Sequence, residues 1–137
     1  MVNRQNSNQS FRDLTVYKKA FELAMEIFEV SKTFPKEERY SLTDQIRRSS
    51  RAVCSCIAEA YRKRNYQAYF VSKSSDADME NSETQAWLDF ARACKYIQDD
   101  QYHDLLAKSE EVGRMLNHMV ENPEKYLRKE EKPAYIK

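Results

Sequence analysis

YSLTDQIRRSSRAVCSCIAEAYRKR, residues 40–64, is the stretch that decides the fold of this chain. At about 100° per residue, its apolar residues share one helical face: Leu42, Ile46, Val53, Ile57 and Ala60. Its arginines gather on a second arc beside that face: Arg47, Arg48, Arg51 and Arg62. A helix with one apolar face packs that face against other helices. The stretch therefore predicts an amphipathic helix that carries more arginine than its own carboxylates can pair.

The composition of the chain favours one small domain made of helices. Its 137 residues include one Gly and three Pro, whereas 33% are charged. Turn-forming residues are therefore few and good helix formers are abundant. A hydrophobic content of 41% is enough for a core, and chains of this length most often form a single domain.

Signals of membrane insertion or export are missing from the sequence. No apolar run approaches the roughly 20 residues that cross a bilayer, and the opening MVNRQNSNQS contains no apolar signal-peptide core. Cys54, Cys56 and Cys94 form an odd set without CxxC spacing, which favours reduced thiols. We therefore expect a cytoplasmic protein that does not bind membranes.

Three further segments repeat apolar residues at steps of three and four. They span residues 13–32, 65–97 and 99–121. Short connections between such segments favour antiparallel neighbours. The sequence thus predicts an all-α, antiparallel up-down-up-down four-helix bundle over residues 11–121. We expect residues 1–10 to be flexible and residues 122–137 to form a charged tail at the periphery.

Charge is unevenly distributed, although the formal net charge is only +1. Residues 36–64 carry eight Lys or Arg and four Asp or Glu, whereas residues 65–100 carry three and seven. The simplest interpretation is that the second and third helices neutralise each other, because buried or partly buried polar groups need partners. We predict a buried or interface salt-bridge layer made of Arg47, Arg48, Glu80 and Glu83.

The basic residues also allow a second interpretation, a nucleic-acid site. Guanidinium and ammonium groups clustered near a helix end can contact phosphates and release counterions. The candidates for this site are Arg51, Arg62, Lys63 and Arg64. Both interpretations remain open at the level of the sequence.

The third predicted helix is apolar over an unusually wide arc. Beside its core stripe it carries Tyr69, Trp87, Phe90, Cys94 and Ile97. A helix that is apolar over so wide an arc usually touches more than one neighbour. We therefore predict that these five residues form a subunit interface of a homo-oligomer.

Several motifs occur in a specific order along residues 11–121. They are the D-L-x-V-x-x-x-A opening at 13–20, the F-P-x-x-E-x-Y-x-L-x-x-Q-x-R-R run at 34–48, I-A-E at 57–59, E-x-x-E-T-Q at 80–85 and the pair Tyr96-Ile97. Together they resemble the bacterial four-helix-bundle family encoded in intervening sequences of 23S rRNA genes. That family is related to the accessory protein of diversity-generating retroelements.

The resemblance implies an antiparallel bundle that assembles into a ring, typically a homopentamer, without known enzyme activity. The retroelement branch binds nucleic acid and a reverse transcriptase through a basic surface, but this chain lacks that branch's strongly basic overall charge. The motifs also depart from the family pattern at Cys56 and Ala60, where the family commonly has Asn and Gly.

Catalytic and metal-binding patterns are not found in the sequence. Glu-x-x-His pairs, which build metal centres in four-helix bundles, do not occur. The single glycine, Gly113, excludes a Gly-rich phosphate loop, and no histidine is placed to activate a cysteine. We predict a non-enzymatic scaffold or interaction module that binds no metal or cofactor and recognises an unidentified protein partner. The alternative is an accessory protein that binds RNA or DNA through basic helix ends.

Overall fold

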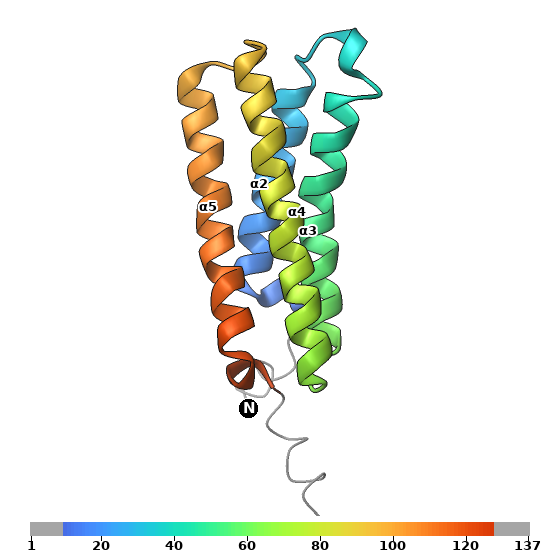
Figure 1. The fold of residues 1–137 in the computed structure, drawn as a ribbon, viewed down its shortest axis with the longest axis vertical. Coiled ribbons are helices and arrows are strands. Elements are labelled where there is room, and N and C mark those ends of the chain that lie inside the picture. Colours follow the sequence, from blue (N-terminus) through green and yellow to red (C-terminus); the bar gives the residue numbers. More distant parts are fainter. Residues whose placement is uncertain (1–9, 128–137) are drawn as a thin grey trace, which may run out of the picture.

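The computed structural model describes residues 10–127, and this part of the chain is an antiparallel four-helix bundle (Figure 1). Its helices are α2 (Thr15–Ser31), α3 (Leu42–Arg62), α4 (Gln67–Ala93) and α5 (Asp99–Glu121). Short 3-10 helices η1 (Phe11–Asp13), η2 (Lys36–Glu38) and η3 (Pro123–Tyr126) flank or join them. Consecutive helices pack together, and α2 also packs on α5, which closes the bundle. The predicted up-down fold is confirmed.

The start of α3 depends on a residue that precedes the helix by four positions. Ser41 is the N-cap residue but makes no capping hydrogen bond with its side chain. Instead, the Glu38 carboxylate accepts hydrogen bonds from the Ser41 hydroxyl at 2.6 Å and from the Leu42 N–H at 3.1 Å. Its other oxygen accepts from the Tyr96 hydroxyl at 2.8 Å. Glu38 therefore satisfies a free N–H of α3 and also ties the start of α3 to the turn after α4.

The core consists of two apolar clusters with a polar layer between them. One cluster includes Ile57, Phe70 and Leu116, and the other includes Ile46 and Leu88. The polar layer between them is made of Ser49, Asn81, Thr84, Gln85 and Ser109. Three of these five side chains come from α4, which explains why the middle of that helix is polar in sequence although it is buried.

The polar layer is joined by hydrogen bonds between helices. The Ser49 and Thr84 hydroxyls are 2.8 Å apart and link α3 to α4. The Asn81 amide donates to the Ser109 carbonyl oxygen at 2.9 Å and accepts from the Ser109 hydroxyl at 2.9 Å, while Gln85 donates to that hydroxyl at 2.9 Å. Gly113 lies beside this group, and a Cβ there would come within 3.3 Å of the Asn81 amide nitrogen. The layer therefore fixes the register of α4 against both neighbours.

The predictions for the two ends fall mostly outside residues 10–127. Within that range, Ser10 forms a capping box with Asp13 at η1. Beyond the predicted bundle boundary, Tyr126 of η3 stacks on Phe70 with ring centroids 5.4 Å apart. Packing on the core thus continues to residue 126.

Candidate functional site

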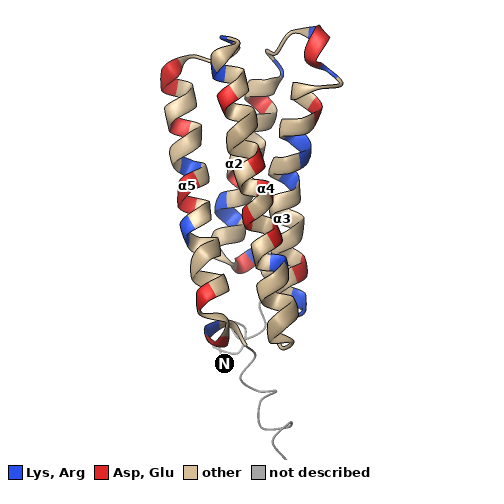
Figure 2. Ribbon diagram, in the orientation of Figure 1, with Lys and Arg blue, Asp and Glu red and all other residues tan. Residues whose placement is uncertain are grey.

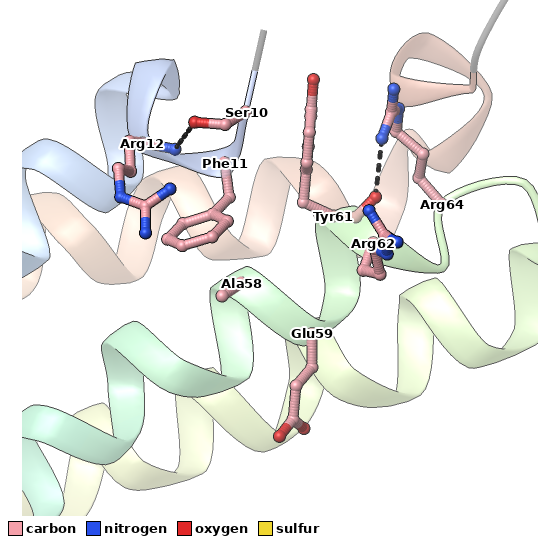
Figure 3. Close-up of a pocket in the computed structure, with 8 residues that line it drawn as sticks. All are labelled: Ser10, Phe11, Arg12, Ala58, Glu59, Tyr61, Arg62 and Arg64. Atoms are coloured by element: carbon pink, nitrogen blue, oxygen red, sulfur yellow. Dashed lines mark hydrogen bonds between the residues drawn. The ribbon is translucent and has the colours of Figure 1, made fainter.

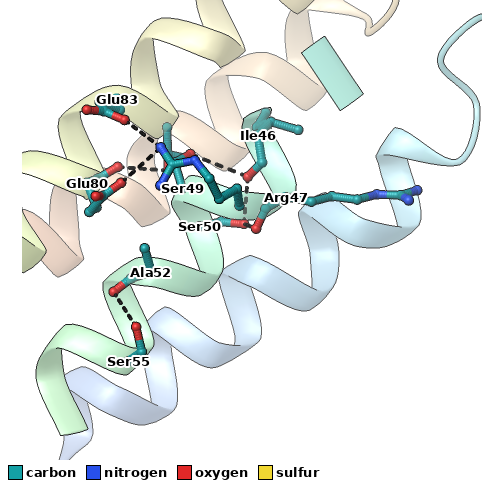
Figure 4. Close-up of polar contacts among 10 residues, drawn as sticks. Ile46, Arg47, Ser49, Ser50, Ala52, Ser55, Glu80 and Glu83 are labelled. Atoms are coloured by element: carbon teal, nitrogen blue, oxygen red, sulfur yellow. Dashed lines mark hydrogen bonds and ion pairs between the residues drawn. The ribbon is translucent and has the colours of Figure 1, made fainter. Parts of the chain in front are cut away.

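The salt bridges predicted between α3 and α4 form around Arg48 (Figure 4). Its guanidinium lies 2.9 Å from a Glu83 oxygen and 3.4 Å from a Glu80 oxygen. The Arg48 and Glu83 side chains are 48% and 40% exposed, whereas Glu80 is 15% exposed, so the group lies at the edge of the contact between α3 and α4 and is only partly buried. Figure 2 shows basic positions of α3 beside acidic positions of α4.

Arg47 does not belong to this group, contrary to the prediction. Its Nε donates to the Ser31 hydroxyl at 2.7 Å, and its guanidinium lies 4.7 Å from the centre of the Phe28 ring. Neighbouring residues of a helix are turned by about 100°. Arg47 therefore faces α2 while Arg48 faces α4. Figure 4 shows the Arg47 side chain extending away from Glu80 and Glu83.

The four residues predicted to bind nucleic acid do not form one surface. Arg64 is 8% exposed, donates to the Tyr61 carbonyl oxygen at 2.8 Å and lies 3.9 Å from the centre of the Tyr61 ring. It turns inward because α3 ends at Arg62 and the chain then bends toward α4. Lys63 lies over the Tyr66 ring at 5.4 Å, whereas Arg51 and Arg62 stay exposed on α3.

Arg62 and Arg64 line a pocket of about 520 Å³ at the end of α3 (Figure 3). Its other lining residues are Ser10, Phe11, Arg12, Ala58, Glu59 and Tyr61. Arg12 was not among the residues predicted from the sequence, because no pattern near residue 12 indicates that this segment packs against the end of α3. The pocket therefore gathers three guanidinium groups from two distant segments.

The carboxylate of Glu59 points away from these arginines (Figure 3). It binds the Lys73 ammonium of α4 at 2.7 Å, and this hydrogen bond raises the pKa of Lys73 to about 12. Because Glu59 is already paired outside the pocket, it neutralises little of the positive charge there. The pocket is consequently basic, and its chemistry suits an anion.

The predicted subunit interface divides into exposed and buried residues. Tyr69, Phe90 and Cys94 are exposed, with Tyr69 at 43% and Phe90 at 57%. Trp87 is half-buried against the core, and its indole N–H is buried without a hydrogen-bond partner in the described part of the chain. Ile97 is 6% exposed and belongs to the core, because α4 ends at Ala93 and the chain turns before residue 97. The prediction that Ile97 belongs to a subunit interface is therefore wrong.

Comparison with known proteins identifies the family. The family model for the 23S rRNA-intervening sequence protein matches residues 12–118. The chain belongs to this family. It is also similar to a crystal structure of a protein with unknown function from the S23 ribosomal protein family of Bacteroides thetaiotaomicron VPI-5482. The two are 28% identical, the match covers 77% of this chain and 95% of that chain, and the TM-score is 0.71. The comparison with curated proteins gave no match.

The motifs that carried the resemblance to the 23S rRNA-intervening sequence family have structural contacts in this chain. In E-x-x-E-T-Q, the two glutamates hold Arg48 and the last two residues belong to the polar layer. Glu59 of I-A-E holds Lys73, and Glu38 of the F-P-x-x-E run organises the start of α3. These contacts join α3 to α4 and α4 to α5, so the motif residues have structural roles in the fold.

Cys54 and Cys56 are poorly suited to nucleophilic chemistry. Burial raises the pKa of the Cys54 thiol to about 11, and burial also raises the pKa of Cys56. A protonated thiol is a weak nucleophile and a weak metal ligand. Over residues 10–127, no three His, Cys, Asp or Glu side chains come together as a metal site. The helices of that region are all too short or too polar to span a membrane.

Proposed function

We propose that this chain is a non-enzymatic, cytoplasmic scaffold that assembles with copies of itself. The observation that carries the proposal is a set of exposed apolar side chains on the outer side of α4. Tyr69, Met79 and Phe90 are 43%, 51% and 57% exposed. Met79 and Phe90 are separated by about 20° around the helix, and Tyr69 lies within about 80° of both. Exposed apolar side chains that share one side of a helix mark an interaction surface.

A ring is the assembly expected from the family resemblance, and a homopentamer is its expected size. A closed ring needs a head-to-tail contact between two different surfaces of each subunit. The exposed apolar side chains on the outer side of α4 form one of these two surfaces.

Sedimentation of the purified chain tests this proposal. We expect the native chain to sediment as an oligomer and the Phe90→Glu variant as a smaller species, because a carboxylate cannot be buried in an apolar contact without a partner. Tyr40→Glu is the matched control, since Tyr40 is 84% exposed and lies away from the outer side of α4. A monomeric native chain, or an unchanged mass for Phe90→Glu, would reject the assignment.

We propose nucleic-acid binding as a second candidate function. It is supported by Arg12, Arg51 and Arg62, which form no ion pair with any carboxylate of residues 10–127. Phosphate binding by these groups weakens steeply with added salt, whereas an apolar protein contact does not. Titration of labelled RNA and DNA at two salt concentrations therefore separates this function from binding of a protein partner.

A further inference from the structure

On the side of the bundle formed by α2 and α3, arginines lie against aromatic rings. Arg12 is 4.5 Å from the centre of the Phe11 ring. Further along, Arg47 and Arg51 of α3 lie 4.7 Å and 5.6 Å from the centre of the Phe28 ring of α2. Guanidinium groups stack on aromatic rings and remain able to bind phosphate oxygens with their N–H groups. The same pairing therefore recurs at both ends of this side.

Between these two ends runs a row of aromatic side chains. The Phe11 and Tyr17 rings meet edge to face with centroids 4.9 Å apart, and Tyr17 and Phe21 stack at 6.0 Å with an angle of 26° between their planes. Phe21 is 49% exposed. Phe28 follows two turns later, roughly 10 Å along the helix. The stacked pair Tyr17 and Phe21, with Phe28 further along, offers π-faces to a ligand along α2.

The arginines of this side form the arginine face, which consists of Arg12, Arg47, Arg51 and Arg62. None of the four pairs with a carboxylate of residues 10–127. On the other sides of the bundle, Arg48, Lys73 and Lys108 each hold two carboxylates. The arginine face thus carries four positive charges that have no carboxylate partner among residues 10–127.

One end of the arginine face opens into the pocket of about 520 Å³ that Arg12 and Arg62 line. That volume lies within the range of small-ligand pockets, roughly 300–1,000 Å³. Arg12 also lines a second hollow, together with Tyr17, Lys18, Phe21 and Glu22. The pocket and the aromatic row thus meet at Arg12, on the side of the bundle that carries the arginine face.

We propose that this surface binds single-stranded nucleic acid. Its phosphates contact the arginine face, bases stack on Tyr17 and Phe21, and one nucleotide enters the pocket. Proteins that bind single strands combine a basic groove with aromatic stacking platforms in this way. A duplex hides its base faces within its own stack, so it would use the arginines but not the aromatic row. An acidic peptide would likewise leave the row unused.

This inference rests on the second candidate function and is independent of self-assembly. The proposed site differs from the one predicted from the sequence. Arg51 and Arg62 belong to both sites, whereas Lys63 and the buried Arg64 are not among the proposed phosphate contacts. Nucleic-acid binding that depends on Lys63 and not on Arg51 would keep the function and overturn this site. Absence of any binding at low salt would overturn both.

The test is a fluorescence-anisotropy titration with labelled oligothymidylate and oligouridylate of about 12 nucleotides, a length within known single-strand site sizes. A duplex of equal length is titrated in parallel. For a single strand, the logarithm of the binding constant falls with the logarithm of the salt concentration with a slope of about −0.7 per neutralised phosphate. A strand whose phosphates contact all four arginines should therefore bind about 50-fold more weakly at 200 mM than at 50 mM salt. Equal or tighter binding of the duplex would overturn the proposal.

Two pairs of variants locate the site. Arg51→Glu should weaken single-strand binding at least ten-fold, whereas Arg114→Glu, the same charge change on an exposed residue of α5, should change it less than two-fold. Phe21→Ala should weaken binding about five-fold or more through lost stacking, with Phe90→Ala of α4 as its control. Equal effects within either pair would overturn the site.

Two competing occupants give different results in the same experiments. If Phe21→Ala or Arg51→Glu lowers the sedimenting mass, a second copy of the chain covers this side and the proposal fails. If adenosine monophosphate displaces the labelled strand at the strand's own dissociation constant, the pocket alone binds a free nucleotide and the strand assignment fails. We expect no displacement at that concentration, because most of the proposed contacts lie outside the pocket. We also expect an unchanged sedimenting mass, because self-assembly is proposed to use α4.

Discussion

At the scale of single residues, Glu38 connects two parts of the fold through three hydrogen bonds. One carboxylate oxygen accepts from Ser41 and Leu42 at the start of α3, and the other accepts from Tyr96 after the end of α4. The hydrogen bond from Ser41, followed by those from Tyr96 and Leu42, lowers the pKa of Glu38 below its ordinary value of 4.5. The ionised form is therefore the one that the fold prefers.

Glu38→Gln should lower the melting temperature by a few degrees at about pH 7, and the loss should shrink in acid. A carboxyl whose folded pKa is depressed stabilises the fold above its unfolded pKa, and this contribution disappears as the pH falls through the folded pKa. Thermal unfolding at about pH 7 and about pH 3 measures the difference. Glu37→Gln is the control, because no hydrogen bond of the Glu37 side chain occurs among residues 10–127. A loss that is constant with pH would contradict the assignment.

Among residues 10–127, Lys95 is the one non-glycine residue whose backbone is left-handed, with φ at 66°. It follows α4, where the Tyr96 N–H donates to the Ala91 carbonyl oxygen at 2.9 Å, and glycine is the residue that such helix ends prefer. Lys95→Gly should therefore raise the free energy of unfolding by up to about 1 kcal/mol. Lys95→Ala keeps the strain and should leave stability within about 0.5 kcal/mol of the native chain. Urea denaturation of the native chain and the two variants measures these free energies. Equal values for the native chain and Lys95→Gly would show that glycine relieves no backbone strain.

At the scale of the helices, the polar layer determines how α4 sits between its neighbours. Ser49 and Thr84 are 0% and 1% exposed, and their hydroxyls bond to each other across the α3–α4 contact. Each hydroxyl also lies within hydrogen-bond distance of a backbone carbonyl oxygen of its own helix, Ile46 at 3.4 Å and Glu80 at 3.0 Å. The energy of the bond between the two hydroxyls can be measured with a double-mutant cycle.

Ser49→Ala and Thr84→Val should each lower the free energy of unfolding by about 1–2 kcal/mol. The double variant should lose less than the sum by at least about 0.5 kcal/mol, because each single variant already loses the bond between the two hydroxyls and that bond can be lost only once. Ser74→Ala serves as the control. The Ser74 hydroxyl is buried and has no hydrogen-bond partner in the part of the chain that the structure covers, so its removal should be neutral or stabilising. Strict additivity of the two changes would mean that the hydroxyls do not act together.

Helix periodicity was enough to predict the order and direction of the four helices, and it failed where helices end. Ile97 was assigned to a surface by continuing helical geometry past Ala93, where the chain already turns. Arg64 was grouped with the basic residues at the end of α3, but the chain turns after Arg62 and Arg64 is buried. The capping role of Glu38 escaped notice because a serine occupies the usual capping position. The pocket was missed because Arg12 reaches it only through tertiary packing. Helix periodicity therefore does not predict where side chains lie once a helix has ended, because tertiary packing determines their positions.

At the scale of the whole molecule, the two proposed surfaces lie on different sides of the bundle. The outer side of α4 carries the exposed Met79 and Phe90, and the arginine face lies over α2 and α3. Assembly through α4 would repeat the arginine face once per subunit. Several copies on one particle allow a long strand to bind more than one subunit, which strengthens binding without any new contact.

Comparison of short and long strands tests this coupling. The smaller Phe90→Glu species should bind an oligothymidylate of about 12 nucleotides as tightly as the native oligomer, because each site is complete within one subunit. A strand of about 40 nucleotides should bind the native oligomer at least ten-fold more tightly than the variant, since the second contact becomes intramolecular. Tyr40→Glu should behave as the native chain with both strands. If Phe90→Glu weakened the short strand as well, the site would need residues from two subunits, and the arginine face could not be the whole of it.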